Sequence, residues 1–276
     1  MAWNEVAANL FHRRYQPLDV SVCVIRAADG LAVVDTRSSP RQADELRADL
    51  RELGDLPVSW VVNTHAHFDH CFGNQRFSPI PVYGHVRMPA HLDEFERPEL
   101  AGWIAAGGQQ AEEWREVIIT PPTHLIEGQN EITVGDRAVE LIHLGRGHTD
   151  NDLVVHVPDA AAWLVGDLVE ESGPPFYGPD SFPLEWPVTL TRLLALAGDN
   201  DVLVPGHGRA AGLAFAQTQQ TQLAEVASLI RELHAAGTPA RKAIAAGGTR
   251  WPLPVSGLSP AVEVGYAQLG SPVDAG

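Results

Sequence analysis

The sequence predicts an α/β fold in which two β-sheets pack together and helices cover their outer faces. Its 276 residues are enough for a large buried core, and with 45% hydrophobic and 20% charged residues the composition is that of an ordinary globular protein. The predicted elements follow a similar order in the two halves of the chain. The first half has strands, a helix, a strand and helices, and the second has strands, a helix, a strand and a helix, which favours two packed sheets. No break in composition marks a linker, so we expect one domain over residues 1–276.

In the first half, alternating and β-branched residues predict strands, and a helix follows the first pair. Ser39 and Pro40 form a typical N-cap and first helical residue, and Gly54 ends the apolar helical spacing. The last strand runs directly into THAHFDHCFGN, which places a histidine cluster at the carboxyl end of a strand, where α/β sheets bind ligands. The predicted elements are strands at 19–26, 31–35 and 57–63 and a helix at about 40–53.

In the second half the predicted elements are mostly strands, with two helices near the end. Residues 85–116 favour helix but are interrupted by Pro and Gly, so we expect a surface excursion there. Residues 171–187 are rich in Pro, Gly and aromatic residues, a composition typical of an irregular loop or lid. The tail, 237–276, gives little signal. The expected strands are 131–134, 138–143, 153–157, 162–165 and 201–204, and the expected helices are 187–196 and 212–236.

Charge and composition limit the partners and the compartment. The formal net charge of −16 would repel nucleic acids and anionic membrane surfaces. No apolar run is long enough for a membrane span or a signal peptide, so we expect a cytoplasmic protein, and we expect Cys23 and Cys71 to be free thiols. The chain contains one lysine, Lys242, and 12 histidines. We therefore expect acid-base or metal chemistry to be carried out by His, Asp and Glu.

The densest chemical signal is a group of four candidate metal ligands within six residues: His65, His67, Asp69 and His70. In an extended stretch, side chains two residues apart point to the same side, so His65 and His67 can bind one ion. A turn after them would direct the other two toward a second ion. Imidazole and carboxylate suit zinc, and also iron or manganese, and the lack of a thiolate argues against a closed structural zinc site.

Three more candidates follow strand-like runs and adjoin glycine: His148 in GRGHTDND, Asp167 in LVGDLVEE and His207 in VPGHGRA. Each could serve as a loop, turn or cap residue if it stood alone. A neighbouring glycine lets the backbone approach a metal closely, because no Cβ is in the way. Together with the histidine cluster, these positions predict a catalytic metal centre.

This ordered set of motifs (D, HxHxDH, H, D, H) resembles the metallo-β-lactamase superfamily over about residues 19–212, with a helical extension at about 213–276. The resemblance implies an αββα sandwich of two mixed sheets with a dinuclear metal site, most often zinc, at one edge. It assigns His65, His67 and His148 to the first metal, Asp69, His70 and His207 to the second, and Asp167 to the bridging position.

The resemblance also implies two supporting roles. Asp35 matches an aspartate that holds the ligand loop by hydrogen bonds, and Asp69 is expected to orient or deprotonate the attacking water as well as to bind metal. The family often has glycine two residues after the first aspartate, but this chain has Arg37. We expect that difference to affect loop shape and not metal binding.

The activity implied is metal-dependent hydrolysis by a metal-activated hydroxide of an ester, thioester, lactone or amide bond in a small molecule. One alternative is a metallo-β-lactamase acting on β-lactam rings, although one subgroup of those enzymes has cysteine where this chain has Asp167 and another lacks a bridging carboxylate. A second alternative is a persulfide dioxygenase of the same superfamily, with a single iron.

Several other polar residues receive no functional role from the sequence. Cys71 is expected to point away from the ligands, Asp150, Asn151 and Asp152 to shape a turn, and Glu170 and Glu171 to face solvent. The remaining histidines lack an obvious partner and are expected to be structural or exposed: His12, His85, His91, His124, His143, His156 and His234.

Overall fold

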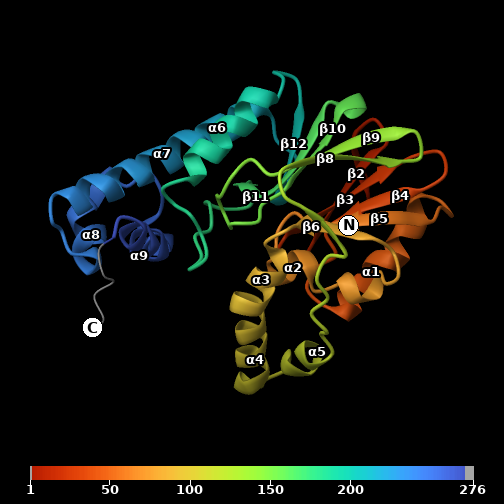
Figure 1. Ribbon diagram of the computed structural model, residues 1–276, viewed down its shortest axis with the longest axis horizontal. Helices are drawn as coiled ribbons and strands as arrows, with labels where there is room; N and C mark the ends of the chain where they lie inside the picture. Colours follow the sequence, from red (N-terminus) through yellow and green to blue (C-terminus); the bar gives the residue numbers. More distant parts are fainter. Residues whose placement is uncertain (1, 271–276) are drawn as a thin grey trace.

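Two β-sheets face each other across the centre of the molecule, and helices lie on the outside of both (Figure 1). The computed structural model describes residues 2–270. The first sheet contains β1 (Asn4–Ala7), β2 (Leu10–Tyr15), β3 (Val20–Arg26), β4 (Leu31–Val34), β5 (Val58–Val62), β6 (Val82–His85) and β7 (His124–Ile126). The second contains β8 (Gln129–Val134), β9 (Arg137–Ile142), β10 (Val154–Val157), β11 (Ala162–Glu170) and β12 (Val202–His207).

The two sheets are mixed, and a short contact joins them. Strands β4 to β7 are parallel, β8 to β11 are antiparallel, and β12 runs parallel to β11. The antiparallel pairing of β12 with β3, through His207 and Val20, links both sheets into one hydrogen-bonded path. The fold is therefore the predicted sandwich, and a candidate ligand lies at the link between its sheets.

Helices separate and follow the strands of both sheets. Helix α1 (Pro40–Leu50) is capped by Ser39, whose side chain accepts from the Gln42 N–H at 3.2 Å, as the sequence predicts. A π-helical turn (Leu92–Glu96) connects α3 to α4. The other helices are α2 (Phe68–Cys71), α3 (Met88–His91), α4 (Arg97–Ala106), α5 (Ala111–Arg115), α6 (Trp186–Leu196), α7 (Leu213–Ala235), α8 (Ala240–Gly247) and α9 (Ser259–Gln268).

Alternation along the strands determines the layers. In β3, Cys23 and Ile25 join residues of the second sheet in the central core, while Val22 and Val24 pack against Leu46 and its neighbours on α1. The outer face of β11 packs in the same way against α6 and α7. Because both faces of these strands are buried, their sequences are nearly continuous runs of apolar residues.

The structure corrects the predicted extent of several elements. Strand β11 does not end before Gly166 but continues to Glu170, because Gly166 adopts a φ of +52° and absorbs an irregularity in the pairing with β12. Strands β1, β2, β6 and β7 were not expected, since they are short or carry charged residues on half-exposed positions. Among the described residues, no helix has the length and apolar character that a membrane crossing requires.

Trp186 connects the second sheet, the 171–185 loop and α6. Its side chain is fully buried, its Nε1 donates to the carbonyl of Leu168 at 3.2 Å, and its ring meets those of Tyr177 and His148 at centroid distances of 5.2 and 5.4 Å. Packing of this indole therefore positions a candidate ligand as well as the loop.

Replacing this indole should destabilise the fold. We expect Trp186→Ala to lower the free energy of unfolding by about 3–5 kcal/mol, because it leaves a large cavity and removes one of the hydrogen bonds to the Leu168 carbonyl. Urea unfolding followed by circular dichroism measures the change. Val188→Ala, at a position on the same helix that is 52% exposed, is the control and should change stability by less than about 0.5 kcal/mol. Equal unfolding midpoints for the two variants would contradict this account of Trp186.

Candidate metal centre

The loop that carries the histidine cluster is held by Asp35 at the end of β4. One carboxylate oxygen, Oδ1, accepts from the Thr64 N–H at 2.8 Å, and Oδ2 accepts from Thr64 Oγ1 and from His70 Nδ1, both at 2.8 Å. All three residues are buried. Asp35 thus makes the supporting contacts that the resemblance assigned to it.

The backbone beside Asp35 explains where this chain departs from the family pattern. Both Asp35 and Arg37 have left-handed backbones, with φ values of +68° and +71°. Glycine adopts this conformation freely, whereas other L-residues pay about 1–2 kcal/mol. The Arg37 guanidinium offsets the strain by lying 3.9 Å over the Tyr15 ring and donating to the Gln42 carbonyl at 3.0 Å. The difference at Arg37 thus lies in the conformation of this loop.

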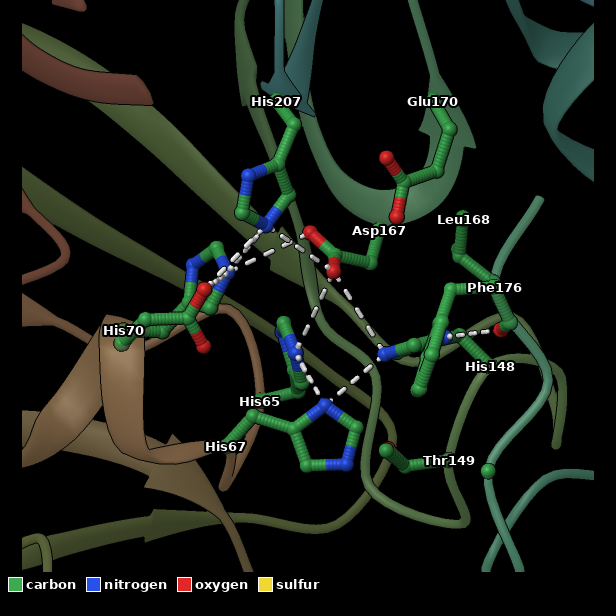
Figure 2. Close-up of polar contacts among 12 residues, drawn as sticks. His65, His67, His70, His148, Thr149, Asp167, Leu168, Glu170, Phe176 and His207 are labelled. Atoms are coloured by element: carbon green, nitrogen blue, oxygen red, sulfur yellow. Dashed lines mark hydrogen bonds and ion pairs between the residues drawn. The ribbon is translucent and has the colours of Figure 1, made fainter. Parts of the chain in front are cut away.

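The structure brings the first predicted ligand group together. His67 Nδ1 lies 3.1 Å from His65 Nε2 and 2.9 Å from His148 Nε2, although His148 comes from the loop between β9 and β10 (Figure 2). Zinc bound tetrahedrally to nitrogens at about 2.0–2.1 Å would separate them by roughly 3.3 Å. The three nitrogens are therefore spaced as ligands of one ion.

The second predicted group converges beside the first. His207 Nε2 lies 3.3 Å from both His70 Nε2 and Asp69 Oδ2. Asp167 lies between the groups, with Oδ2 3.5 Å from His148 Nε2 and 3.4 Å from His207 Nε2, and Oδ1 3.3 Å from His70 Nε2 (Figure 2). This is the arrangement expected of a carboxylate that bridges two ions.

The outer nitrogen of each imidazole has its own acceptor, which determines the direction of the inner one. Thr64 Oγ1 gives its proton to Asp35 and so accepts from His65 Nδ1 at 3.0 Å. With each outer nitrogen donating and the rings neutral, the inner nitrogens carry lone pairs, and lone pairs 2.9–3.1 Å apart repel unless a proton or a metal ion lies between them. The other acceptors are Asp180 Oδ2 for His67 (2.7 Å), Asp35 Oδ2 for His70 (2.8 Å), the Phe176 carbonyl for His148 (3.1 Å) and the Leu18 carbonyl for His207 (2.9 Å).

The electrostatics of the cleft also favour a cation. Burial lowers the pKa of His148 to about 4, which keeps this ring neutral and able to bind metal. Burial opposes protonation of His67 and His207 too, yet Asp180 raises the pKa of His67 to about 10, and Asp167 and Asp69 raise that of His207. Carboxylates thus give the cleft a negative potential that divalent ions would satisfy.

Glycine lets β12 pass directly behind the bridging position. A Cβ on Gly206 would lie 1.8 Å from Asp167 Oδ1, and one on Gly147, next to His148, would lie 2.6 Å from Leu168 Cδ2. At Gly206 the backbone therefore lies directly against the Asp167 carboxylate, an approach that a side chain at this position would prevent.

Sequence reasoning missed three buried residues near the cleft. Asp180, from the 171–185 loop, accepts from His67 and contacts His91 Nε2 at 3.2 Å, so His91 has a partner after all. The expectation that Glu170 faces solvent is wrong, since it is only 6% exposed and lies beside Asp167 (Figure 2). The extension of β11 past Gly166 turns Glu170 inward. Asp180 and His67 are 113 residues apart, so no pattern in the sequence near either residue predicts their contact.

Other expectations agree with the structure. Both cysteines are free and buried, and Cys71 packs among apolar residues with Phe72 and Met88, away from the ligands. Asp152 shapes the turn after His148 by accepting from the Thr149 N–H and hydroxyl. Of the aromatic residues expected in a lid, Phe176 is 63% exposed and lines the cleft, whereas Tyr177 and Trp186 are core residues.

Five of the candidate ligands, His67, Asp69, His148, Asp167 and His207, line a cleft of about 320 Å³ whose remaining walls are largely apolar. Leu18, Phe68, Pro174 and Phe176 form these walls, and Glu170 and Ser172 are the additional polar residues. Within the described part of the chain, no lysine or arginine lines this cleft.

Comparison with known proteins gives the family. The model of the metallo-beta-lactamase superfamily matches residues 15–207, more than half of the chain. Curated relatives include a metallo-beta-lactamase type 2 from Bacillus cereus (23% identity over 67% of this chain and 65% of the relative), a linear primary-alkylsulfatase from Pseudomonas sp. strain ATCC 19151 (24%, 67% and 41%) and the probable metallo-hydrolase YqgX from Bacillus subtilis strain 168 (30%, 45% and 55%). The chain thus spans 41–65% of the length of these relatives.

Solved structures agree on the fold. A metallo-beta-lactamase from Pontibacter korlensis matches with a TM-score of 0.65 and 18% identity over 80% of this chain and 97% of its own. The DIM-1 metallo-beta-lactamase matches with a TM-score of 0.64 and 21% identity over 82% and 97%. The family match, the shared fold and the predicted order of motifs lead to one conclusion: this chain belongs to the metallo-beta-lactamase superfamily.

Proposed function

We propose that this protein is a dinuclear zinc hydrolase that cleaves an ester, thioester, lactone or amide bond in a small molecule. The observation that carries the proposal is the set of imidazoles whose outer nitrogens are all hydrogen-bonded and whose inner nitrogens point into one space beside Asp69 and Asp167. The names of the curated relatives, which include a metallo-hydrolase and an alkylsulfatase, support a hydrolytic reaction.

The donor set suits the ions proposed. His65, His67 and His148 would hold one ion, Asp69, His70 and His207 the other, and Asp167 would bridge them. Nitrogen and carboxylate donors without a thiolate suit zinc and also accept iron or manganese. Two such ions would supply a polarised substrate carbonyl and a water whose pKa is close to neutral.

The chain's own residues would position and deprotonate the nucleophile. Asp69 lines the cleft, and its Oδ2 faces His207 at 3.3 Å. Asp69 would orient the attacking water and accept its proton. The Asp35 and Asp180 carboxylates would keep His70 and His67 in the tautomers that bind metal.

The walls of the cleft support a neutral substrate with an apolar group. Leu18 and Phe176 expose 42% and 63% of their surface, and Glu170 adds a carboxylate where an anionic substrate would need a cation. The formal charge of −16 disfavours nucleic acids as substrates. Among the described residues of the cleft, no contact specifically favours β-lactam hydrolysis or iron-dependent persulfide oxidation.

Metal should be necessary for activity. We expect the purified protein to contain up to two equivalents of zinc by elemental analysis and to hydrolyse members of a panel of esters, thioesters, lactones and amides. His67→Ala should lose metal and reduce kcat/KM by at least about 100-fold. Mutation of a residue that only hydrogen-bonds to a metal ligand already lowers metal affinity or activity by about 10–100-fold, and His67 is itself a proposed ligand.

The matched control for this test is His124→Ala, at an exposed position on β7. This variant should keep the metal content and activity of the unmodified chain. Hydrolysis that survives both chelation and His67→Ala in a folded preparation would refute the proposal, and turnover of phosphodiesters alone would refute the substrate class.

The Asp180 carboxylate should tighten metal binding by orienting His67. We expect Asp180→Asn to weaken zinc affinity by about 10–100-fold, measured by competition with a chromophoric chelator. Asp199→Asn, at an exposed position, is the control and should bind zinc unchanged. Identical affinities for the two variants would leave Asp180 with a purely structural role.

A further inference from the structure

A second cavity of about 150 Å³ adjoins the metal cleft and shares two wall residues with it. Leu18 and Phe68 line both spaces, so the cavity opens beside the candidate ligands and not on a remote face. Its other apolar walls are Tyr15, Pro17, Val20 and Trp114. A chain attached to a group at the metal centre could enter it by passing between Leu18 and Phe68.

Contacts on both sides fix the walls of this cavity relative to the candidate ligands. Leu18 lies in the turn between β2 and β3, and its carbonyl accepts from His207 Nδ1 at 2.9 Å. Phe68 directly follows His67, and its ring meets the Trp103 and Trp114 rings at 4.9 and 6.0 Å. Movement of either wall would therefore disturb a candidate ligand, which couples the shape of the cavity to the metal centre.

Helix α5 contributes Glu113 and Trp114 to the wall of the cavity and is tied to α1. Glu113 forms an ion pair with Arg41 at 2.9 Å and accepts a hydrogen bond from the Ser39 hydroxyl. Gln42 and Gln110 supply neutral amides at this end. The excursion between β6 and β7 thus provides a wall of the cavity.

The chemistry of the lining selects the occupant. Among the described residues that line the cavity there is no lysine or arginine, and the one charged residue, Glu113, is already paired with Arg41. A carboxylate or phosphate would find no partner there, whereas alkyl or aryl carbons would replace water against aromatic walls.

We propose that this cavity is the binding site for an uncharged alkyl or aryl chain on the acyl side of the substrate, whose scissile carbonyl lies at the metal centre. The proposal rests on the proposed hydrolase function and narrows its substrate class to apolar acyl compounds. Affinity for the chain comes from burial of its carbons between Tyr15, Val20 and Trp114.

The test compares p-nitrophenyl esters of acetate, butyrate, hexanoate and octanoate with the zinc-loaded protein. We expect kcat/KM to rise by up to about fourfold for each methylene that is buried, until the cavity is full. The octanoate-to-acetate ratio of kcat/KM is the readout, because this ratio does not depend on how much of the preparation carries metal.

Two variants fill the cavity from opposite ends. Leu18→Trp, at a position that is 42% exposed, should obstruct the entrance and bring the ratio close to one. Gln110→Trp, at an exposed position of the cavity wall just before α5, should shorten the preferred acyl chain. It lies outside the loop that carries His65 to His70. Leu196→Trp is the matched control, since this leucine is 54% exposed and lines neither space, and it should keep the original ratio.

Binding of 1-octanol by calorimetry tests the cavity without any reaction. The unmodified chain and Leu196→Trp should bind octanol at least about tenfold more tightly than Leu18→Trp, and ethanol should not bind measurably. The proposal would be overturned if kcat/KM did not change with chain length. It would also be overturned if Leu18→Trp had the same octanoate-to-acetate ratio as the unmodified chain. If no acyl compound is hydrolysed, the proposed function fails, and equal octanol binding by all variants would then overturn the cavity assignment separately.

Discussion

The candidate metal centre depends on the two β-sheets facing each other with their loop-bearing edges aligned. The histidine cluster follows β5 in the first sheet, whereas His148, Asp167 and His207 come from the second. Nitrogen and oxygen atoms of side chains from both sheets must come within 3–4 Å of one another. The pairing of β12 with β3 next to the cleft fixes this register, and Gly206 allows β12 to pass close behind Asp167.

The same centre concentrates buried polar groups that would be costly on their own. His65, His70 and Asp167 are almost completely shielded from water, and their inner atoms lie within hydrogen-bonding distance of other ligand atoms. Bound divalent ions would convert repulsion between lone pairs and carboxylates into attraction. Metal binding and stability of the folded state are therefore expected to be coupled.

Apolar packing surrounds this polar centre and connects it to the rest of the fold. Trp186 packs against His148 from the α6 side, and Phe68 places an aromatic cluster next to His67 on the other. Asp180 reaches His67 from the irregular loop before α6. Segments with weak secondary-structure signals thus contribute hydrogen bonds and cavity walls to the centre, which explains why they are ordered around it.

The sequence by itself determined β3 to β5, the strands of the second sheet, the Ser39 cap and the order of candidate ligands, because strand patterns, capping residues and the HxHxDH spacing are local. Contacts between segments distant along the chain were decided only by tertiary structure. Asp180 and His67 meet across 113 residues, and Glu170 is buried because Gly166 lets β11 continue beyond its apolar run. Neither contact is visible in the residues next to Asp180 or Glu170, because the partners come from segments that only the folded chain brings together.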